Sequence, residues 1–183
     1  MKKILMFSGI GILVTALLSP LGATEFLIGE SAIPSSPIDD DAYLAGGKVL
    51  VNEPVSGDAV IAGGRLIVNA AIGEDLLIAG GSLVINGPVG DDLRAAGGDI
   101  TISGDVADDL IAAGGNITVP RNVRIGGDLL AAGGQVTLEG TVEGNLRAVG
   151  CRIVFSRGWT CPYSETALPR RGLRFHGAPC VEL

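Results

Sequence analysis

The chain has 183 residues, a formal net charge of −7 and 29 glycines, yet 47% of its residues are hydrophobic and only 4% are aromatic. A disordered glycine linker would be far less apolar, a collagen would place glycine at every third residue, and a nucleic-acid-binding protein would carry a basic face. The single histidine, His176, leaves little material for histidine-based metal sites or catalytic triads. The composition therefore favours an architecture that uses glycine and small aliphatic residues at regular intervals.

Residues 1–23 resemble an export signal. Lys2 and Lys3 precede an apolar run from Ile4 to Leu18, and Ala23 ends a small-residue cleavage region. The alternative is an uncleaved N-terminal membrane anchor, although the run is short of the roughly 20 residues that a spanning helix needs. We expect an exported protein of the periplasm or cell envelope, or one anchored to the membrane by this segment. Residues 24–39 are rich in proline and serine and are expected to form a flexible lead-in.

An internal repeat determines the predicted fold. The tripeptide Ala-Gly-Gly recurs at intervals of 17, 17, 17, 17 and 19 residues, and a degraded copy follows at Val149. The repeats start at Ala45, Ala62, Ala79, Ala96, Ala113 and Ala132. A unit of this length is too short for most helical repeats. We therefore predict an all-β protein, a parallel β-helix or solenoid of about seven 17-residue coils over residues 40–158.

The inside of each unit has the pattern of short strands. Ile100 and Ile102 flank Thr101, and Leu93 and Ala95 flank Arg94, so that apolar residues alternate with period two. A third short segment, such as the one around Val106, completes three strands per coil. Ordering one coil costs more free energy than its few aliphatic residues return, so the coils are predicted to be stable only when stacked.

Twin glycines are predicted to form one corner of every coil, where a positive φ or the close contact of neighbouring coils excludes a side chain. A phosphate-binding loop is the alternative, but no helix start follows any copy. These structural glycines are Gly46, Gly47, Gly63, Gly64, Gly80, Gly81, Gly97, Gly98, Gly114, Gly115, Gly133 and Gly134.

Aspartates recur at a second corner and are expected to accept hydrogen bonds from neighbouring backbone N–H groups. Their mutual repulsion is expected to raise their pKa values as a group. A ladder of divalent cations such as Ca²⁺ is the alternative. The 19-residue interval adds Pro120–Arg124, which we interpret as a bulged corner loop or, because of its two arginines, a contact patch. The corner aspartates are Asp58, Asp75, Asp92, Asp109 and Asp128.

The runs "GGDLLAAGGQVTLEGTVEGNLRAVG" (126–150) and "DDLRAAGGDITISGDVADDLIAAGGNITV" (91–119) resemble bactofilins, which are bacterial polymer-forming cytoskeletal proteins. The resemblance implies a right-handed parallel β-helix and a non-enzymatic, membrane-associated scaffold. It also implies filaments that form head to head or head to tail without nucleotide or other cofactors. Typical bactofilins act on the cytoplasmic face of the membrane, whereas this chain begins with a predicted export signal. It is therefore interpreted as an exported or envelope-anchored variant.

A solenoid has two open ends, which must be capped or joined to another copy. Leu44, Val49 and Val51 are predicted to form the self-assembly surface of the first coil. Leu146, Ile153 and Phe155 are predicted to form that of the last coil. The expected partners are other copies of the chain, with the membrane or the cell wall as a further partner and no nucleic acid.

The alternative function is a monomeric exported module that binds a surface through the acidic corner. No catalytic site is predicted, and the six-residue period and catalytic histidine of the hexapeptide acyltransferases, which are also β-solenoids, are missing. No resident metal is predicted.

Residues 159–183 lack the repeat and are expected to form an irregular tail. Cys161 and Cys180 can pair in an oxidising compartment, which would leave Cys151 unpaired. A zinc site from the three cysteines and His176 is available by count, but the spacing matches no compact pattern. A Cys/His catalytic pair has no residue to orient it.

Overall fold

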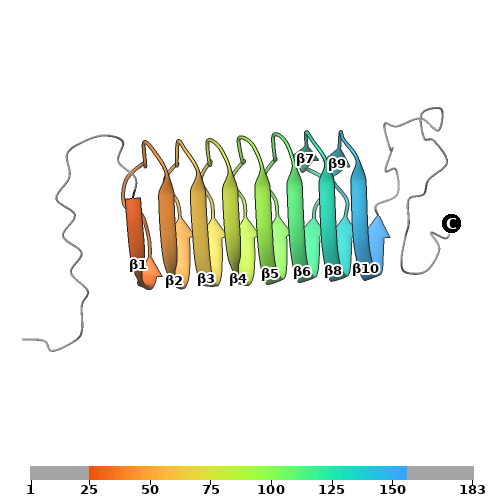
Figure 1. Cartoon of the computed structure of the whole chain (residues 1–183), viewed down its shortest axis with the longest axis horizontal. Coiled ribbons are helices and arrows are strands. Elements are labelled where there is room, and N and C mark those ends of the chain that lie inside the picture. Colours follow the sequence, from red (N-terminus) through yellow and green to blue (C-terminus); the bar gives the residue numbers. More distant parts are fainter. Residues whose placement is uncertain (1–24, 156–183) are drawn as a thin grey trace, which may run out of the picture.

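The structure, a computed structural model, describes residues 25–155, which form a straight stack of β-strands (Figure 1). Eight long strands make one parallel sheet in the order β1-β2-β3-β4-β5-β6-β8-β10. No helix that could cross a membrane is present among these residues. The predicted all-β parallel solenoid is confirmed, and it has about eight turns. The long strands are β1 (Glu25–Ala32), β2 (Ala42–Val51), β3 (Ala59–Val68), β4 (Leu76–Ile85), β5 (Leu93–Ile102), β6 (Leu110–Val119), β8 (Leu129–Leu138) and β10 (Leu146–Phe155).

Each long strand bends at its central glycines and so contributes two limbs to one coil. In β5 the residues that face the core are Leu93 and Ala95 in the first limb and Ile100 and Ile102 in the second. The third side of the coil is narrower and is held by single parallel bridges. These bridges connect Ile38, Val55, Ile72, Val89, Val106 and Ile125. The three segments expected per coil are present, and the first two form one continuous strand.

Aliphatic side chains fill the interior of the rod. Leu66, Leu76, Leu93 and Leu110 are completely buried, and no polar or charged side chain is buried in residues 25–155. Equivalent residues of successive coils lie directly above one another, as in the pairing of Leu93 with Leu110. Fully burying one aliphatic side chain contributes roughly 1.5–3 kcal/mol, and the continuous columns add these contributions along the rod.

The longer interval between the sixth and seventh long strands leaves the main sheet in register. Its extra residues form a turn, in which the N–H of Val123 donates to the carbonyl oxygen of Pro120 at 3.1 Å. Arg124 then begins the short strand β7 (Arg124–Ile125), which pairs with β9 (Thr141–Val142). Arg121 lies 3.5 Å from Glu139, and Arg124 also pairs with an acidic residue of the next coil. The insertion is therefore the bulged corner loop that its sequence predicts.

The N-terminal boundary differs from the prediction. Residues 25–32, expected in a flexible lead-in, form β1 and pair with β2 in the register of the other coils. Gly29 lies opposite Gly46, and Ile38 continues the bridges of the third side. The rod thus begins one coil earlier than its Ala-Gly-Gly motifs. The predicted signal at 1–23, the tail at 159–183, Cys161 and Cys180 lie outside the described residues.

Candidate interaction surfaces

The twin glycines lie where successive coils approach most closely. A Cβ atom on Gly97 would lie 2.7 Å from the carbonyl oxygen of Gly80, and one on Gly98 would lie 2.8 Å from that of Gly81. No glycine in residues 25–155 has a φ in the left-handed region. Of the two predicted reasons for glycine, close coil-to-coil contact is therefore correct and positive φ is wrong.

The aspartates of the second corner form a hydrogen-bonded ladder along the rod. Oδ1 of Asp58 accepts the backbone N–H of Asp75 at 3.0 Å, and Oδ1 of Asp75 accepts that of Asp92 at 3.1 Å. The same contact recurs from Asp41 to Asn145, with distances from 2.6 to 3.1 Å. The predicted bonding of these carboxylates to backbone N–H groups is confirmed. Each bond also joins one coil to the next, so the acidic corner contributes to stacking.

One group of carboxylates on this corner has a spacing suited to a cation. Asp91, Asp92 and Asp108 place oxygen atoms within 4.8 Å of one another. Asp92 is already engaged, because its Oδ1 accepts a backbone N–H of the next coil and its Oδ2 lies 2.6 Å from Nη2 of Arg94. Hydrogen bonding to Asp75 and the charge of Asp92 raise the pKa of the Arg94 guanidinium. Arg94 therefore supplies positive charge to this corner.

Two aspartates of this corner have pKa values that are shifted in opposite directions. The pKa of Asp108 is raised above its usual 3.8, chiefly by the neighbouring charge of Asp109. The pKa of Asp128 is lowered, because the backbone N–H and side-chain amide of Asn145 donate to its carboxylate at 2.7 and 3.0 Å. The predicted rise of pKa along the whole row is thus wrong for Asp128, where the hydrogen bonds from Asn145 outweigh the effect of desolvation.

The opposite shifts give a test by pH. Because the pKa of Asp108 is higher in the folded state than in the unfolded state, its ionised carboxylate destabilises the fold at pH values above the folded-state pKa. This destabilisation is lost below about pH 3.8, the pKa of the group in the unfolded chain, because the carboxyl is then protonated in both states. Asp108→Asn should therefore raise Tm by about 1–2 °C at pH 7 and leave it unchanged near pH 3.

Asp128→Ala should lower Tm at pH 7. The ionised carboxylate of Asp128 stabilises the fold above about pH 3.8, and this stabilisation is lost as the pH falls through the lower pKa of the folded state. Thermal unfolding followed by circular dichroism measures both, and shifts of the same sign would contradict this interpretation.

A groove of about 430 Å³ lies on the third side of the rod. Its lining is mostly small and apolar, with Asp105 and Arg124 as the charged residues. Oδ1 of Asp105 accepts the backbone N–H of Arg124 at 2.8 Å, and Nη2 of Arg124 lies 2.7 Å from Glu143. The charged groups of the groove therefore bond to the rod itself.

The C-terminal end of the described rod is an open cross-section. Among residues 25–155, β10 is paired only with β8. Leu146 and Ile153 are partly exposed there, whereas the equivalent Leu129 and Val136 of the preceding coil are 2% and 0% exposed. Phe155 packs against the core and is also partly buried. The structure thus places all three predicted end residues on the last strand.

The N-terminal end differs in chemistry and position from the prediction. Leu44, Val49 and Val51 are at most 2% exposed, and β1 pairs with the segment that holds Leu44 and Val49, so their assignment as an exposed assembly surface is wrong. On β1 itself, Glu25 occupies a column that faces the core in the other coils. An inward charge at a sheet edge hinders the addition of another strand. Among the described residues, the N-terminal edge strand therefore carries a charge in a core-facing column, whereas the C-terminal edge strand carries apolar residues there.

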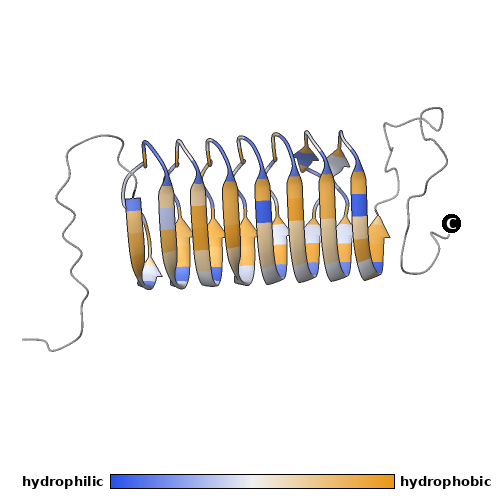
Figure 2. Cartoon of the chain, viewed as in Figure 1, coloured by the Kyte–Doolittle hydropathy of each residue, from blue (hydrophilic) through white to orange (hydrophobic). Residues whose placement is uncertain are grey.

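The first limbs are coloured mostly as hydrophobic along the rod (Figure 2), and we call the outward side of these limbs the lateral face. Two columns of side chains cover it in register along the rod. The first, the bulky column, contains Phe26, Tyr43, Val60, Leu77, Ile111 and Leu130. Arg94 and Arg147 occupy its remaining positions. Leu77, Ile111 and Leu130 are 49%, 42% and 43% exposed, so large apolar side chains recur on this surface.

The second column of the lateral face is almost entirely alanine. Ile28 begins it and Val149 ends it, and the six residues between them form the alanine column. These are Ala45, Ala62, Ala79, Ala96, Ala113 and Ala132. At the N-terminal end, the rings of Phe26 and Tyr43 stack with their centroids 4.8 Å apart. The sequence pattern indicated which residues alternate with the core, but the apolar outward face was not predicted.

Over residues 25–155, the fold and these surfaces define a parallel β-solenoid with an acidic corner, an apolar lateral face and a last strand that is paired on one side. Comparisons with protein-family models, curated proteins and solved structures gave no match.

Proposed function

We propose that the protein is a non-enzymatic structural scaffold whose rods join end to end, as the polymer-forming bactofilins that its repeat resembles do. In this proposal it is exported and acts at the cell envelope, in keeping with the sequence of residues 1–23. The acting surfaces are the ends of the solenoid, and the partner is another copy of the chain.

The open cross-section at β10 carries this proposal. Within the described chain, the backbone of β10 forms hydrogen bonds with β8 on one side only. Its Leu146 and Ile153 are the last members of two core columns and are partly exposed. A strand from a second rod would pair with this edge and cover those side chains, which the described residues leave partly exposed. A join of unlike ends that does not close on itself produces a filament.

The N-terminal edge modulates this assembly. Glu25 and the buried Pro34, which has no N–H to donate, make β1 a less favourable template than β10. Joining through β1 requires Glu25 to lose water or to become protonated. Both head-to-head and head-to-tail joins remain within the proposal.

Electron microscopy of the purified full chain over a range of concentrations tests the proposal. We expect unbranched filaments whose length increases with protein concentration and which form without nucleotide. A strictly monomeric rod at every concentration, confirmed by analytical ultracentrifugation, would exclude end-to-end assembly.

The cluster of three carboxylates formed by Asp91, Asp92 and Asp108 favours a second candidate function, a monomeric module that binds a surface through a cation. Because Asp92 already bonds to Arg94 and to the backbone, we expect millimolar Ca²⁺ to change Tm by less than about 1 °C. Thermal unfolding in Ca²⁺ and in chelator measures this. A concentration-dependent rise in Tm that Asp91→Asn abolishes would support the cation-binding function instead.

A further inference from the structure

We propose that the lateral face binds the lateral face of a second copy, with the two rods side by side and parallel. The inference rests on the proposed function, since it describes how end-to-end filaments associate sideways. It concerns a different surface, the outward side of the first limb, so variants on that surface test it separately from the ends.

Side-chain size along the two columns favours a parallel pair. A two-fold axis along the rod exchanges the columns at equal height, so that Leu77 of one rod lies on Ala79 of the second rod. The same exchange places Ile111 on Ala113 and fills each small position with a large side chain. An antiparallel pair would set the bulky columns against each other and hold the alanine columns apart. Such gaps forfeit a large part of the dispersion energy.

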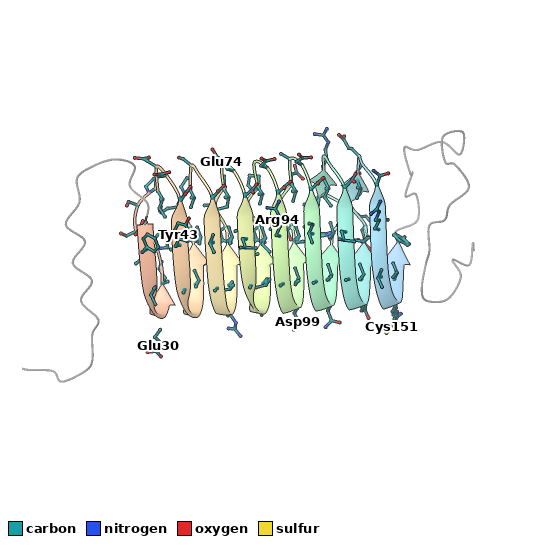
Figure 3. The ribbon with its side chains drawn as sticks, in the orientation of Figure 1. Glu30, Tyr43, Glu74, Arg94, Asp99 and Cys151 are labelled. Carbon is teal, nitrogen blue, oxygen red and sulfur yellow. The ribbon has the colours of Figure 1, made fainter. Side chains whose placement is uncertain are left out.

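Charges at the two rims of the lateral face favour the same orientation. One rim is the acidic corner, and the other follows the twin glycines, where Asp99 is drawn in Figure 3. The column along this second rim has three cations and one acidic residue, with Lys48 and Arg65 at the heights of Asp41 and Asp58. The third cation is Arg152 and the acidic residue is Asp99. A parallel pair brings each acidic corner to the rim that carries these cations. An antiparallel pair brings the two acidic corners together, which is repulsive.

Arg94 is compatible with a covered lateral face. Its guanidinium is turned to the acidic corner, where it lies 3.0 Å from Oδ2 of Asp75 and 2.6 Å from Oδ2 of Asp92. Its charge therefore stays at the rim, which solvent reaches, while its aliphatic stem covers the face (Figure 3). A lipid surface is a less suitable occupant, because the continuous row of aspartates beside the face repels anionic headgroups.

The size of the face explains why pairing should depend on filament length. Eight coils spaced by about 4.8 Å and a limb about 15 Å wide give roughly 570 Å² per rod. A standard stable interface buries about 800 Å² on each partner. Single rods should therefore pair weakly, whereas rods joined end to end present a continuous face whose contacts act together.

A pair of lysine substitutions tests the proposal in the full chain. Ile111→Lys with Leu130→Lys introduces two charges into the bulky column. The matched control, Thr118→Lys with Thr137→Lys, introduces two charges on the outward side of the second limb of the same strands. Electron microscopy should show paired filaments for the wild type and the control. The Ile111/Leu130 variant should form single filaments of unchanged length.

Outcomes for the two proposals are separable. If the wild-type filaments are single, or if the Ile111/Leu130 variant stays paired, the lateral proposal is wrong while end-to-end assembly stands. If no filaments form, sedimentation equilibrium of the rods still decides. The wild type should then dimerise at high concentration, and the Ile111/Leu130 variant about tenfold or more weakly. Wild-type rods that remain monomeric, or that bind phosphatidylcholine vesicles through Ile111 and Leu130 without pairing, would overturn the proposal.

Disulfide trapping tests the orientation. In a chain with serine at positions 151, 161 and 180, Leu130→Cys chains mixed with Ala132→Cys chains should cross-link, because a parallel pair places these positions in contact. An antiparallel pair would instead cross-link Leu130→Cys chains with Tyr43→Cys chains, and that result would contradict the parallel arrangement.

Discussion

Replacing Gly97 by valine should destabilise the rod by about 3 kcal/mol or more. A Cβ atom at this position would lie 2.7 Å from the carbonyl oxygen of Gly80 and 3.1 Å from the side chain of Leu83. Gly97 is paired with Gly80 on one side and Gly114 on the other, so the backbone cannot move away without disturbing both neighbours. Urea unfolding of the full chain, followed by circular dichroism, measures the free energy of unfolding.

Ala96→Val is the matched control for this substitution. Ala96 precedes Gly97 in β5, but its side chain is exposed on the lateral face, where a β-branched residue is compatible with a strand. We expect its free energy of unfolding to stay within about 0.5 kcal/mol of the wild-type value. An equally small effect for Gly97→Val would mean that close contact between coils does not explain the twin glycines.

The spacing of the Ala-Gly-Gly motifs was sufficient to predict the fold, because a solenoid repeats the same contacts in every coil. A single period therefore determined strand order, parallel pairing and the columns of the core. The same reliance on the motif led to the error at the N-terminus. Residues 25–32 keep only one glycine of the Ala-Gly-Gly motif, Gly29, and Pro34 and Pro37 suggested a loop. Proline is tolerated at an edge, where its missing N–H breaks no bond within the sheet.

The surfaces were less predictable than the core. Alternation identifies which side chains point outward, but it does not show that Leu77, Ile111 and Leu130 form one column of exposed apolar side chains. That column requires the register between coils and the direction in which each limb faces. The sequence also predicted that the corner aspartates accept backbone N–H groups, but only the register shows that each donor belongs to the next coil.

Replacing Ile153 by arginine should strongly weaken end-to-end assembly while leaving the rod folded. Ile153 is partly exposed on β10 and continues the column of Val136, which is completely buried. A second rod joined here would bury the new charge without a partner, which costs about 3–5 kcal/mol and raises the concentration needed for filaments by roughly 100-fold or more. Light scattering and electron microscopy over a concentration series measure this threshold.

Val154→Arg provides the control on the same strand. Val154 is 37% exposed and alternates with Ile153, so its substitution adds the same charge away from the cross-section. Filaments of Val154→Arg should form at the wild-type threshold, and both variants should keep the wild-type Tm within about 3 °C, because neither position is fully buried. Equal thresholds for the two variants would show that the β10 cross-section is not the joining surface. Loss of filaments with Ile153→Arg alone would assign assembly to the exposed end of the core. The N-terminal edge could then be tested with Glu25→Leu. This variant removes the inward charge and should lower the protein concentration at which filaments form.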